Sequence, residues 1–477
     1  MASCAEARNA VEGDGGSLWR RRFARAFDTQ PRVDLVKIKS MYQERKAVLH
    51  VIHPAFQWMG HVPNLSFDLG MGQQEVVALK LLKDLIIGEW PPLKIPSWRH
   101  ISNTNTEAFT NKPDNQDSEY ESVNLAHIID FAQKSNLLRI VGKSDRSQEY
   151  FLANEIPHPA TSLLYTIQCV LAPLLLSFDN AHRYHQFGFY EAQMMVYLDD
   201  VTAPILLGHT GQSVNMSWLL KNIQFWRHHF LTVGEPLAPF FEGLEKSELP
   251  ALWSHKLSQG RRELGCHWKG SYAFVDRDEI KLVRDGRSGQ GNSPMIQDKM
   301  NGEEDPDCPF QSIQLNLAPD DNVHTWNRDF EGMLDSLKTP EKKSRTRAQK
   351  SATGGADTQE TDFATSSYHF TGHGNDDAED FEMEGWLNPL PPQNGIPGWQ
   401  RVTMMKFFRE QDDTIDMGAL WAYEGIMIPG GKIMIGRWWC PTDGTGPDMY
   451  SGPFILWNVP CGPPKRPEPD VSCEPQV

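Results

Sequence analysis

Closely spaced cysteines are missing from this 477-residue chain, whose seven cysteines are scattered without a C-x-x-C pair. Disulfide frameworks and structural zinc sites need denser spacing. We therefore expect neither, and we expect the reducing cytoplasm or nucleus as the setting. A long apolar run is missing too, because the most apolar stretch, Leu163 to Phe178, contains Gln168 and Pro173 and falls short of the ~20 residues of a membrane span. The first residues also lack the apolar segment of a signal peptide.

Positive charge is in short supply across the chain. The 46 basic side chains are outnumbered by 62 acidic ones, which leaves a net charge of −16 at pH 7. Surfaces that bind nucleic acid or anionic membranes need an excess of Lys and Arg to neutralise phosphate groups. The charge balance therefore predicts that neither nucleic acid nor a membrane is a partner.

Motifs of catalysis and cofactor binding are also absent from the sequence. The chain has no G-x-S-x-G nucleophile elbow, and its glycine-rich stretch at 286–291 lacks the Lys-Ser or Lys-Thr that completes a phosphate loop. Histidine pairs, of which His369 with His373 beside Asp376 is the best placed, lack the ligand spacing of a zinc site. We therefore expect no catalytic residue, no cofactor and no metal.

The hydrophobic pattern divides the chain into an α-rich part and a β-rich part. Apolar residues recur with a helical period before residue 250 and alternate with polar residues after about residue 265. Polar stretches rich in Gly and Pro have little to bury and are expected to be disordered. The expected divisions are a disordered arm at 1–30, an α-rich domain at 31–250, an antiparallel β-barrel domain at 265–458 with loose inserts near 285–309 and 340–365, and a disordered tail at 461–477. The predicted fold class is α+β.

Four segments of the α-rich part show helical spacing of apolar residues. They are residues 33–51, 75–87, 162–177 and 218–231. Pro173 is expected to break the third helix, because proline cannot donate the backbone hydrogen bond of a helix interior. Residues 187–198 fit a buried strand as well as a helix.

Residues 420–439 give the most specific local prediction. Two alternating stretches flank Pro429-Gly-Gly-Lys432, which is a hairpin signal because paired glycines permit the positive φ angles of a tight turn. Setting Pro429 opposite Lys432 fixes the register of both strands. The predicted pairs are Glu424 with Arg437, Ile426 with Ile435, Tyr423 with Trp438, and Gly425 with Gly436. Adjacent Trp438 and Trp439 must then point to opposite faces of the sheet, one into the interior and the other toward a rim or the helices.

Glu424 and Arg437 are therefore candidates for a ligand-binding ion pair inside a barrel. The alternative is a structural bridge on a solvent-facing sheet surface, or a partly buried plug, because exposed ion pairs are common and contribute little. The hairpin pattern leaves both interpretations open.

Six short motifs follow one another in the β-rich part. They are Trp268-Lys-Gly-Ser-Tyr272, Phe370-Thr-Gly-His-Gly-Asn-Asp376, Lys406-Phe-Phe408, Trp421-Ala-Tyr-Glu-Gly425, Ile435-Gly-Arg-Trp438 and Gly452-Pro-Phe-Ile-Leu456. This series resembles the calycin-like β-barrel attached to the F-box in fungal and animal F-box proteins, and it is similar to large uncharacterised fungal families. The sequence departs from that pattern at Phe408, where the family has tyrosine, and at Glu379-Asp-Phe381, where the family has Gly-x-Phe.

The resemblance implies a barrel that binds a peptide or protein partner, and an adaptor role in a ubiquitin ligase with the Skp1–cullin machinery as partner. Residues 31–100, where an F-box is expected, contain no convincing version of that helical motif. The part of the resemblance that applies to this chain is therefore a barrel of the kind that acts as a substrate receptor. The candidate ligand-binding residues are Trp268, Tyr272, His373, Asp376, Tyr423, Glu424, Arg437 and Trp438.

The expected function is thus that of an intracellular binding module, an F-box-like substrate receptor. One alternative is a small-molecule-binding barrel enzyme of the isomerase or cyclase kind, with His373, Asp376 and Glu424 as its acid and base groups. Another is a non-catalytic scaffold. An enclosed pocket that contains those three groups favours the enzyme, whereas a barrel filled with Trp and Phe disfavours it.

Overall fold

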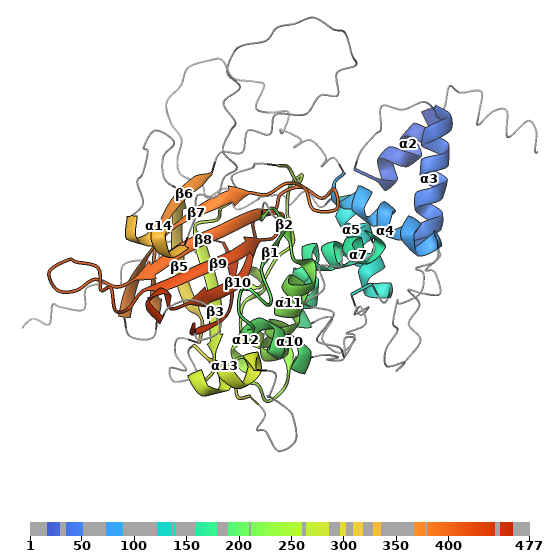
Figure 1. The fold of residues 1–477 in the computed structure, drawn as a ribbon. Helices are drawn as coiled ribbons and strands as arrows, with labels where there is room; N and C mark the ends of the chain where they lie inside the picture. Colours follow the sequence, from blue (N-terminus) through green and yellow to red (C-terminus); the bar gives the residue numbers. More distant parts are fainter. Residues whose placement is uncertain are drawn as a thin grey trace, which may run out of the picture.

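Most of the helices precede the strands of the barrel along the chain, which confirms the predicted α+β class (Figure 1). The computed structural model describes residues 17–28, 35–50, 73–88, 122–135, 137–138, 159–178, 189–208, 211–259, 264–285, 296–301, 309–317, 328–334, 367–376, 379–443 and 449–460. The helices are α2 (Ser17–Ala26), α3 (Leu35–His50), α4 (Gln73–Ile86), α5 (Val123–Lys134), α7 (Pro159–Val170), α8 (Ala172–Leu175), α10 (Phe189–Tyr197), α11 (Met216–Leu231), α12 (Ala238–Glu242), α13 (Arg277–Arg284) and α14 (Arg328–Leu334), with short 3₁₀ turns η3 (Lys246–Glu248) and η4 (Pro441–Asp443). The strands are β1 (Leu206–Leu207), β2 (Ser213–Val214), β3 (His267–Phe274), β4 (Lys299–Met300), β5 (Gln311–Leu317), β6 (Tyr368–Asp376), β7 (Glu379–Pro389), β8 (Gln400–Phe407), β9 (Trp421–Met427), β10 (Ile433–Trp439) and β11 (Ser451–Val459).

The four predicted helical segments are confirmed as α3, α4, α7 with α8, and α11. The third is broken as expected, because α7 ends at Val170 and Pro173 stands in the first turn of α8, where its missing N–H costs no helical hydrogen bond. The ambiguous segment 187–198 contains helix α10. Within the described ranges, no helix is both long enough and apolar enough to cross a membrane.

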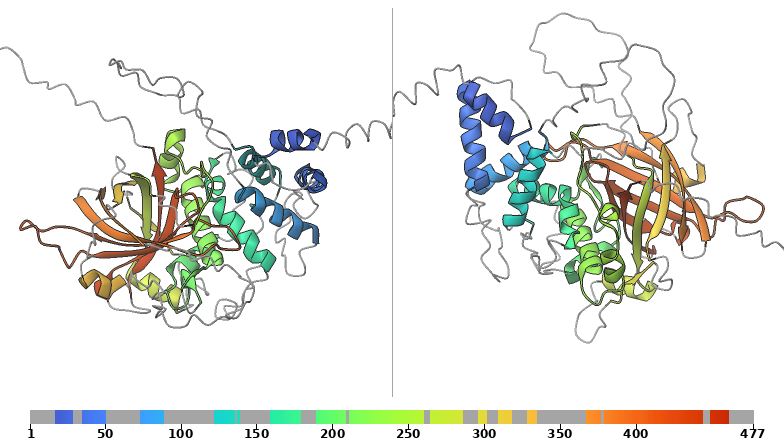
Figure 2. Two further views of the ribbon diagram at one scale, coloured as in Figure 1. Left: turned by 90° about the horizontal axis from the view of Figure 1, so that it is seen from above. Right: turned by 180° about the vertical axis from the view of Figure 1, so that it is seen from behind.

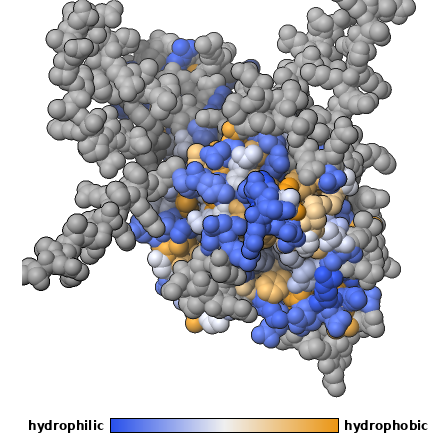
Figure 3. All heavy atoms as spheres, turned by 90° about the vertical axis from the view of Figure 1, so that its left-hand side faces the viewer, coloured by the Kyte–Doolittle hydropathy of each residue, from blue (hydrophilic) through white to orange (hydrophobic). Residues whose placement is uncertain are grey.

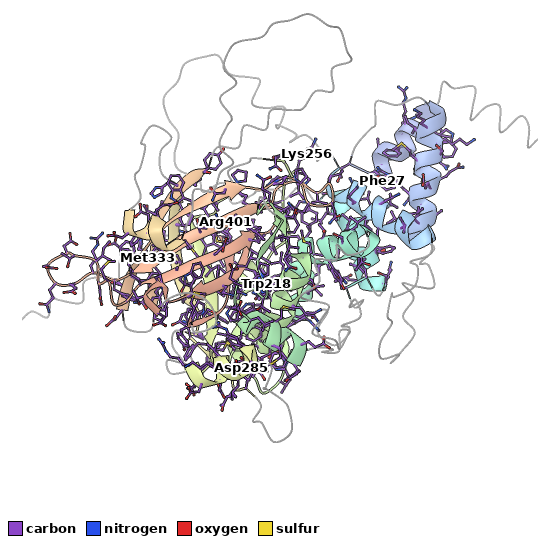
Figure 4. All side chains as sticks on the ribbon, viewed as in Figure 1. Phe27, Trp218, Lys256, Asp285, Met333 and Arg401 are labelled. Atoms are coloured by element: carbon purple, nitrogen blue, oxygen red, sulfur yellow. The ribbon has the colours of Figure 1, made fainter. Side chains whose placement is uncertain are left out.

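The predicted disordered arm at 1–30 is wrong for residues 17–28, which contain helix α2. Phe23 and Phe27 stand one turn apart, are both 1% exposed, and have ring centroids 5.0 Å apart. Arg45 of α3 covers both rings, with its guanidinium carbon 5.1 and 5.0 Å from their centroids. Figure 4 labels Phe27 where the α2–α3 pair meets the other helices. The arginine-rich composition hid this short apolar stripe, which becomes a helix face only because α3 covers it.

Eight strands close into an antiparallel barrel, as predicted. Their order round the barrel is β3, β5, β6, β7, β8, β9, β10 and β11, and β11 pairs with β3 to close the ring. The connection from β8 to β9 projects from the left-hand end of the barrel in Figure 1. Full closure leaves these eight strands without an open edge on which another chain could pair.

Of the insert expected near 285–309, the structure describes residue 285, residues 296–301 and residue 309. Residues 296–301 within it are well defined, because β4 pairs with β3 and the Asn301 N–H donates to Tyr272 O at 3.1 Å. The looseness predicted there is therefore wrong for this stretch, which long-range contacts hold in place. The insert at 340–365 and the tail at 461–477 lie outside the described residues.

The predicted register of the β9–β10 hairpin is confirmed at every pair. The structure places Glu424 opposite Arg437 and Gly425 opposite Gly436, together with the other predicted partners. The turn needs both of its glycines, since Gly430 and Gly431 have φ angles of 99° and 66°. Strand alternation also separates the adjacent tryptophans as expected: Trp438 is in the interior cluster, and Trp439 packs outside against a cluster shared with α14.

The barrel interior is a packed core of Trp, Phe, Met and aliphatic side chains. Glycines on the inner face make room for the rings. A Cβ on Gly374 would stand 2.5 Å from Phe381 Cζ, and one on Gly372 would stand 2.4 Å from Leu315 Cδ2. The F-x-G-x-G motif is therefore a packing motif, in which Phe370 and its two glycines share the inner face.

Helix α11 covers the outer face of β10 and β11. Ile435 and Trp457 on that face belong to the same core as the buried residues of the helices. Trp218 of α11 lies in this layer (Figure 4), and Asn222 of the same helix donates its side-chain N–H to Gly436 O at 3.2 Å. The helices and the barrel thus share one continuous core, with α10 to α12 along one side of the barrel (Figure 2).

Candidate functional site

Four of the eight predicted ligand-binding residues lie on the inner face of the barrel. Trp268, Tyr272, Tyr423 and Trp438 all belong to the interior cluster or pack on it. Trp268 is fully buried and donates its indole N–H to a backbone carbonyl at 2.7 Å, which makes it a satisfied core residue. Tyr423 stands edge-on to Phe454 in the middle of the barrel, with ring centroids 5.1 Å apart. Tyr272 and Trp438 lie nearer to one end.

The other predicted residues are not in the interior. His373 is exposed on the outer face of β6, and the side chain of Asp376 lies outside the described residues. Glu424 and Arg437 are neighbours on the outer face of the hairpin, which corrects the expectation of an ion pair inside the barrel. Glu424 instead accepts a hydrogen bond from Arg401 Nε at 2.6 Å. The aromatic face of the hairpin turns inward because helices cover its isoleucine face.

Arg437 is a buried link between the barrel and the helices. It is 1% exposed, and its Nη2 donates to Ala203 O at 3.0 Å, while Nη1 lies 3.4 Å from Asp200 Oδ1. Its guanidinium carbon also lies 5.4 Å from the centre of the Trp218 ring. Burial lowers the pKa of the Arg437 guanidinium, and the carboxylates of Asp200 and Glu424 oppose that shift. Its contacts describe a structural clamp.

One end of the barrel is ringed by aromatic side chains around a lysine. Here β3, β6, β8 and β10 finish and β5, β7, β9 and β11 begin, since neighbouring strands are antiparallel. The aromatic mouth is the set Tyr272, Phe274, Phe381, Lys406, Phe408, Trp421, Trp438 and Tyr450. Phe381, Lys406 and Trp438 are buried, and the remaining members are half-buried. The mouth thus has a buried floor and partly exposed aromatic walls.

Trp438 organises one half of the aromatic mouth. The rings of Trp421, Tyr450 and Tyr272 meet it edge to face, with centroids 5.3, 5.3 and 5.9 Å away. Its indole N–H donates to Ala273 O at 3.1 Å, which fixes the orientation of the ring. Such edge-to-face contacts are favourable for aromatic pairs, so this half of the mouth is a preformed apolar surface.

Lys406 organises the other half. Its side chain is 3% exposed, and its ammonium lies 4.2, 5.4 and 5.6 Å from the ring centroids of Phe381, Phe408 and Tyr272. Aromatic faces attract a cation electrostatically. Sequence reasoning missed Lys406 as a site residue, although its place two residues after the inward-facing Met404 predicts the same inner face.

The rim of the aromatic mouth is charged. Arg409 lies in the β8–β9 connection and donates to both carboxylate oxygens of Glu382, at 2.6 and 2.9 Å, which lowers the pKa of that carboxyl. Arg277 bonds Asp443 at 2.7 Å. Figure 3 faces this side of the molecule and shows a hydrophilic surface with apolar residues exposed beside it. A ligand at this end therefore meets polar groups first and aromatic rings below them.

A second polar cluster, the His229 network, joins α10 and α11 to the segment that contains β4. His229 is buried, with Nδ1 2.7 Å from Glu235 Oε2 and Nε2 3.3 Å from Asp298 Oδ2, the latter an ion-pair contact outside hydrogen-bond alignment. Tyr197 and Gln193 donate to the two oxygens of Asp298 at 2.8 and 2.6 Å. Across the described ranges, no group of three or more His, Cys, Asp or Glu residues is placed to hold a metal ion. The printed contacts connect α10 and α11 to Glu235 and to Asp298.

The His229 network shifts the pKa values of its members in opposite senses. Hydrogen bonds from His228 and His229 lower the pKa of Glu235 from 4.5 to about 2. Burial opposes the charged form of His229, but its contacts with Asp298 and Glu235 outweigh burial and raise its pKa. Burial and the neighbouring Asp298 raise the pKa of Tyr197 well above its usual value.

These shifts predict a stability maximum in mildly acidic solution. Because the folded pKa of Glu235 is depressed, its contribution is complete above pH 4.5 and is lost as the pH falls toward 2. The raised pKa of His229 adds stability below pH 6.5 that is lost as the pH rises through the folded value. With a quarter of its side chain exposed, Glu235 is expected to contribute about 2 kcal/mol.

Glu235→Gln is expected to flatten both limbs of this pH profile in urea unfolding followed between pH 3 and 8. Glu242→Gln, which changes an exposed carboxylate on α12, serves as the matched control and should leave the profile unchanged. Parallel profiles for the wild type and Glu235→Gln would rule the assignment out.

Comparison of the chain with known protein families, with curated proteins and with solved structures finds no match. The chain is a helical region joined through a common core to an eight-stranded antiparallel β-barrel with a lysine-centred aromatic mouth.

Proposed function

We propose that this protein is a binding module that takes up a segment of a peptide or protein partner at the aromatic mouth. The observation that carries the proposal is the row of half-buried rings at one end of an otherwise packed barrel. Tyrosine and tryptophan supply large contact areas at low entropic cost and dominate the energetics of many interfaces. Trp421, Tyr450 and Tyr272 are positioned for this role by Trp438.

The packing below the mouth supports binding at the end of the barrel rather than deep inside it. Met404, Met427, Met434 and Phe454 fill the barrel behind Trp438 as one contact cluster of buried side chains. A ligand held at the mouth can extend outward past the charged rim. That geometry suits a chain segment better than a fully enclosed metabolite.

The positions of the acid and base candidates weigh against the enzyme alternative. His373 lies on β6 and Glu424 on β9, both on the outer face, with β7 and β8 between them. General acid and base groups must reach the same substrate within hydrogen-bond distance. A binding protein or a scaffold does not need acid and base groups that reach one substrate. Uptake of a ligand at the aromatic mouth distinguishes a binding protein from a scaffold.

The resemblance to barrels attached to F-boxes extends the proposal to a substrate receptor of a Skp1–cullin ubiquitin ligase in the cytoplasm or nucleus. Affinity purification of the full chain from its native host tests this part. Co-purification of Skp1 and cullin supports the ligase role. Absence of Skp1 and cullin would rule out the ligase role. Binding at the mouth is tested separately, by the Trp421→Ala experiment.

Trp421→Ala is expected to weaken peptide binding by roughly tenfold or more, because loss of an anchoring aromatic ring in an interface commonly costs over 1.4 kcal/mol. Peptides are first selected on the full-length protein from a displayed random library. Their affinities for the wild type and the variant are then compared by fluorescence anisotropy. Trp421 is half-buried, so its truncation should leave the barrel folded.

Tyr190→Ala provides the matched control for this experiment. Tyr190 is an aromatic residue of α10 with 43% of its surface exposed, away from the barrel mouth. It should leave the affinity of the selected peptides unchanged. Equal affinities of the Trp421 variant and the wild type, or a library that yields no binders, would contradict binding at the mouth and favour the scaffold.

A further inference from the structure

Basic side chains are concentrated on helices α2 and α3, although the chain as a whole is acidic. The described residues 17–28 and 35–50 contain eight arginines and lysines and two acidic residues, which gives them a net charge of +6. Since the whole chain has a net charge of −16, all its other residues together carry −22. The overall balance, which predicts no nucleic-acid partner, therefore averages over two regions of opposite charge.

The solvent-facing side of α2 is rich in arginine. The apolar stripe of this helix is buried, whereas Arg20, Arg22 and Arg25 are exposed, and the helix contains no acidic residue. Asp28, which follows the helix, accepts hydrogen bonds from two backbone N–H groups at the start of α5, at 2.8 and 3.1 Å. The acidic residue that follows α2 is therefore engaged at α5.

An aromatic ring holds basic side chains in place where the two helices meet. Trp19 is half-buried, and the guanidinium carbon of Arg22 and the ammonium of Lys39 lie 5.7 and 5.6 Å from its ring centroid. Tyr42 of α3 packs beside Trp19, with ring centroids 5.8 Å apart. Aromatic faces attract cations, and a long side chain that is already held in one place loses less conformational entropy when it binds a ligand. The positive charge of Arg22 is thus presented on a fixed support.

The arginine-bearing face of α2 offers charge without an apolar anchor. Among the described residues of α2 and α3, no large apolar side chain is exposed, because Phe23 and Phe27 are covered by residues of α3. A helix that lies on a membrane needs a free apolar face, and the centre of a protein–protein interface is usually apolar. Interfaces with nucleic acids are instead polar and strongly positive, and the planar guanidinium of arginine matches the oxygens of a phosphate.

We propose that α2 and α3 form a nucleic-acid-binding surface, in which Arg20, Arg22 and Arg25 contact the phosphate backbone. Backbone contacts position a protein without reading bases, so binding should not depend on base sequence. The two helices lie at the end of the molecule away from the barrel (Figures 1 and 2). This surface is separate from the aromatic mouth, and the proposal does not depend on binding there. Negative charge in the rest of the chain favours the approach of phosphate at this surface.

Fluorescence anisotropy of the full-length protein with labelled nucleic acids tests the proposal. The probes are a single-stranded RNA of mixed sequence and a DNA duplex of equal length, each titrated between about 50 and 200 mM salt. The triple variant Arg20→Gln, Arg22→Gln and Arg25→Gln removes three charges, and it leaves Arg21 and Lys39, which make further contacts within the chain. We expect it to weaken binding at about 50 mM salt by roughly tenfold or more. The slope of log affinity against log salt should fall by about 2 to 3, since each lost phosphate contact contributes about 1.

The matched control removes the same charge from exposed positions outside α2 and α3. It carries Lys246→Gln, Lys256→Gln and Lys281→Gln, and it should change the affinity by less than about threefold, because salt screens charges that lie far from the bound phosphates. The midpoint of urea unfolding should stay at the wild-type value in both triple variants, since all the changed side chains are exposed. If the arginine variant does not fold, Arg20→Gln with Arg25→Gln leaves the Trp19 contact intact and should lower the slope by about 2.

The outcomes separate nucleic acid from other anionic partners. Equal losses of affinity in the two triple variants, or no binding by the wild type at about 50 mM salt, would overturn the proposal. Binding of phosphatidylserine vesicles or of a polyglutamate peptide, with neither nucleic acid bound, would also overturn it and would assign the surface to a membrane or to an acidic protein. Tighter binding of one probe, weakened by the arginine variant, supports the proposal and assigns the surface to RNA or to DNA. Equal binding of both probes, weakened in the same way, supports recognition of the shared phosphate backbone.

Discussion

Replacing Arg437 by alanine should lower the free energy of unfolding by about 3 kcal/mol, through loss of a charge-assisted hydrogen bond and of buried packing. The variant leaves Ala203 O without its donor inside the layer between barrel and helices. It also removes the guanidinium from the face of Trp218. Because this position lies outside the aromatic mouth, affinity for the selected peptides should stay at the wild-type value wherever the protein is folded.

Arg409→Ala is the matched comparison for Arg437→Ala. Arg409 makes an ion pair with Glu382, but its side chain is 37% exposed, and exposed pairs contribute about 0.2–1 kcal/mol. Urea titrations of the wild type and both variants give the two free energies directly. Small, equal losses would show that burial adds nothing to the Arg437 clamp. If Arg437→Ala instead loses binding while its stability is unchanged, Arg437 is a ligand-binding residue, as the sequence predicted.

The β9–β10 hairpin shows what alternation can and cannot predict. The turn glycines fix which residues stand opposite one another, and every predicted pair is present. Alternation does not say which face turns inward, because both faces are apolar: one carries Ile426 and Ile435, and the other carries Met427 and Met434. That choice depends on α11, about 200 residues earlier in the chain, which covers the isoleucine face.

The other incorrect predictions have the same cause, which is contact between residues that lie far apart in the sequence. Helix α2 has one short apolar stripe, which indicates a buried helix face only once α3 is known to cover it. Residues 296–301 stand in a mostly polar stretch, yet Ile296 and Met300 are buried in the core, and Asp298 contacts Tyr197 and His229, about 100 and 70 residues away. Lys406 was within reach of sequence reasoning through strand alternation. Its full surroundings were not, because Tyr272 comes from β3, which is not a neighbour of β8 and reaches Lys406 only through closure of the barrel, although Phe381 lies on the neighbouring strand β7.

Gly436→Ala should cost more than about 4 kcal/mol, in the range reserved for severe core disruptions. A Cβ at this position would stand 2.1 Å from Glu424 O, 2.6 Å from Gly425 Cα and 2.5 Å from Phe454 Cε1. Two of these atoms belong to the backbone of β9, so the strands must move apart. The Phe454 ring covers the facing glycines in place of their missing side chains, and this is how the hairpin reaches the curvature of a closed barrel.

A graded pair of controls makes this prediction specific to barrel closure. Gly425→Ala meets Ile435 O at 2.7 Å and should cost less than Gly436→Ala, because its nearest conflict is smaller. Gly332→Ala has open space around the added methyl group and lies within α14, so it should stabilise the protein by about 0.5–1 kcal/mol. The free energies come from urea unfolding followed by tryptophan fluorescence. If Gly436→Ala unfolds at the wild-type midpoint, β9 and β10 are not held in register across their glycines. The inward orientation of Trp438, and with it the described geometry of the aromatic mouth, would then be wrong.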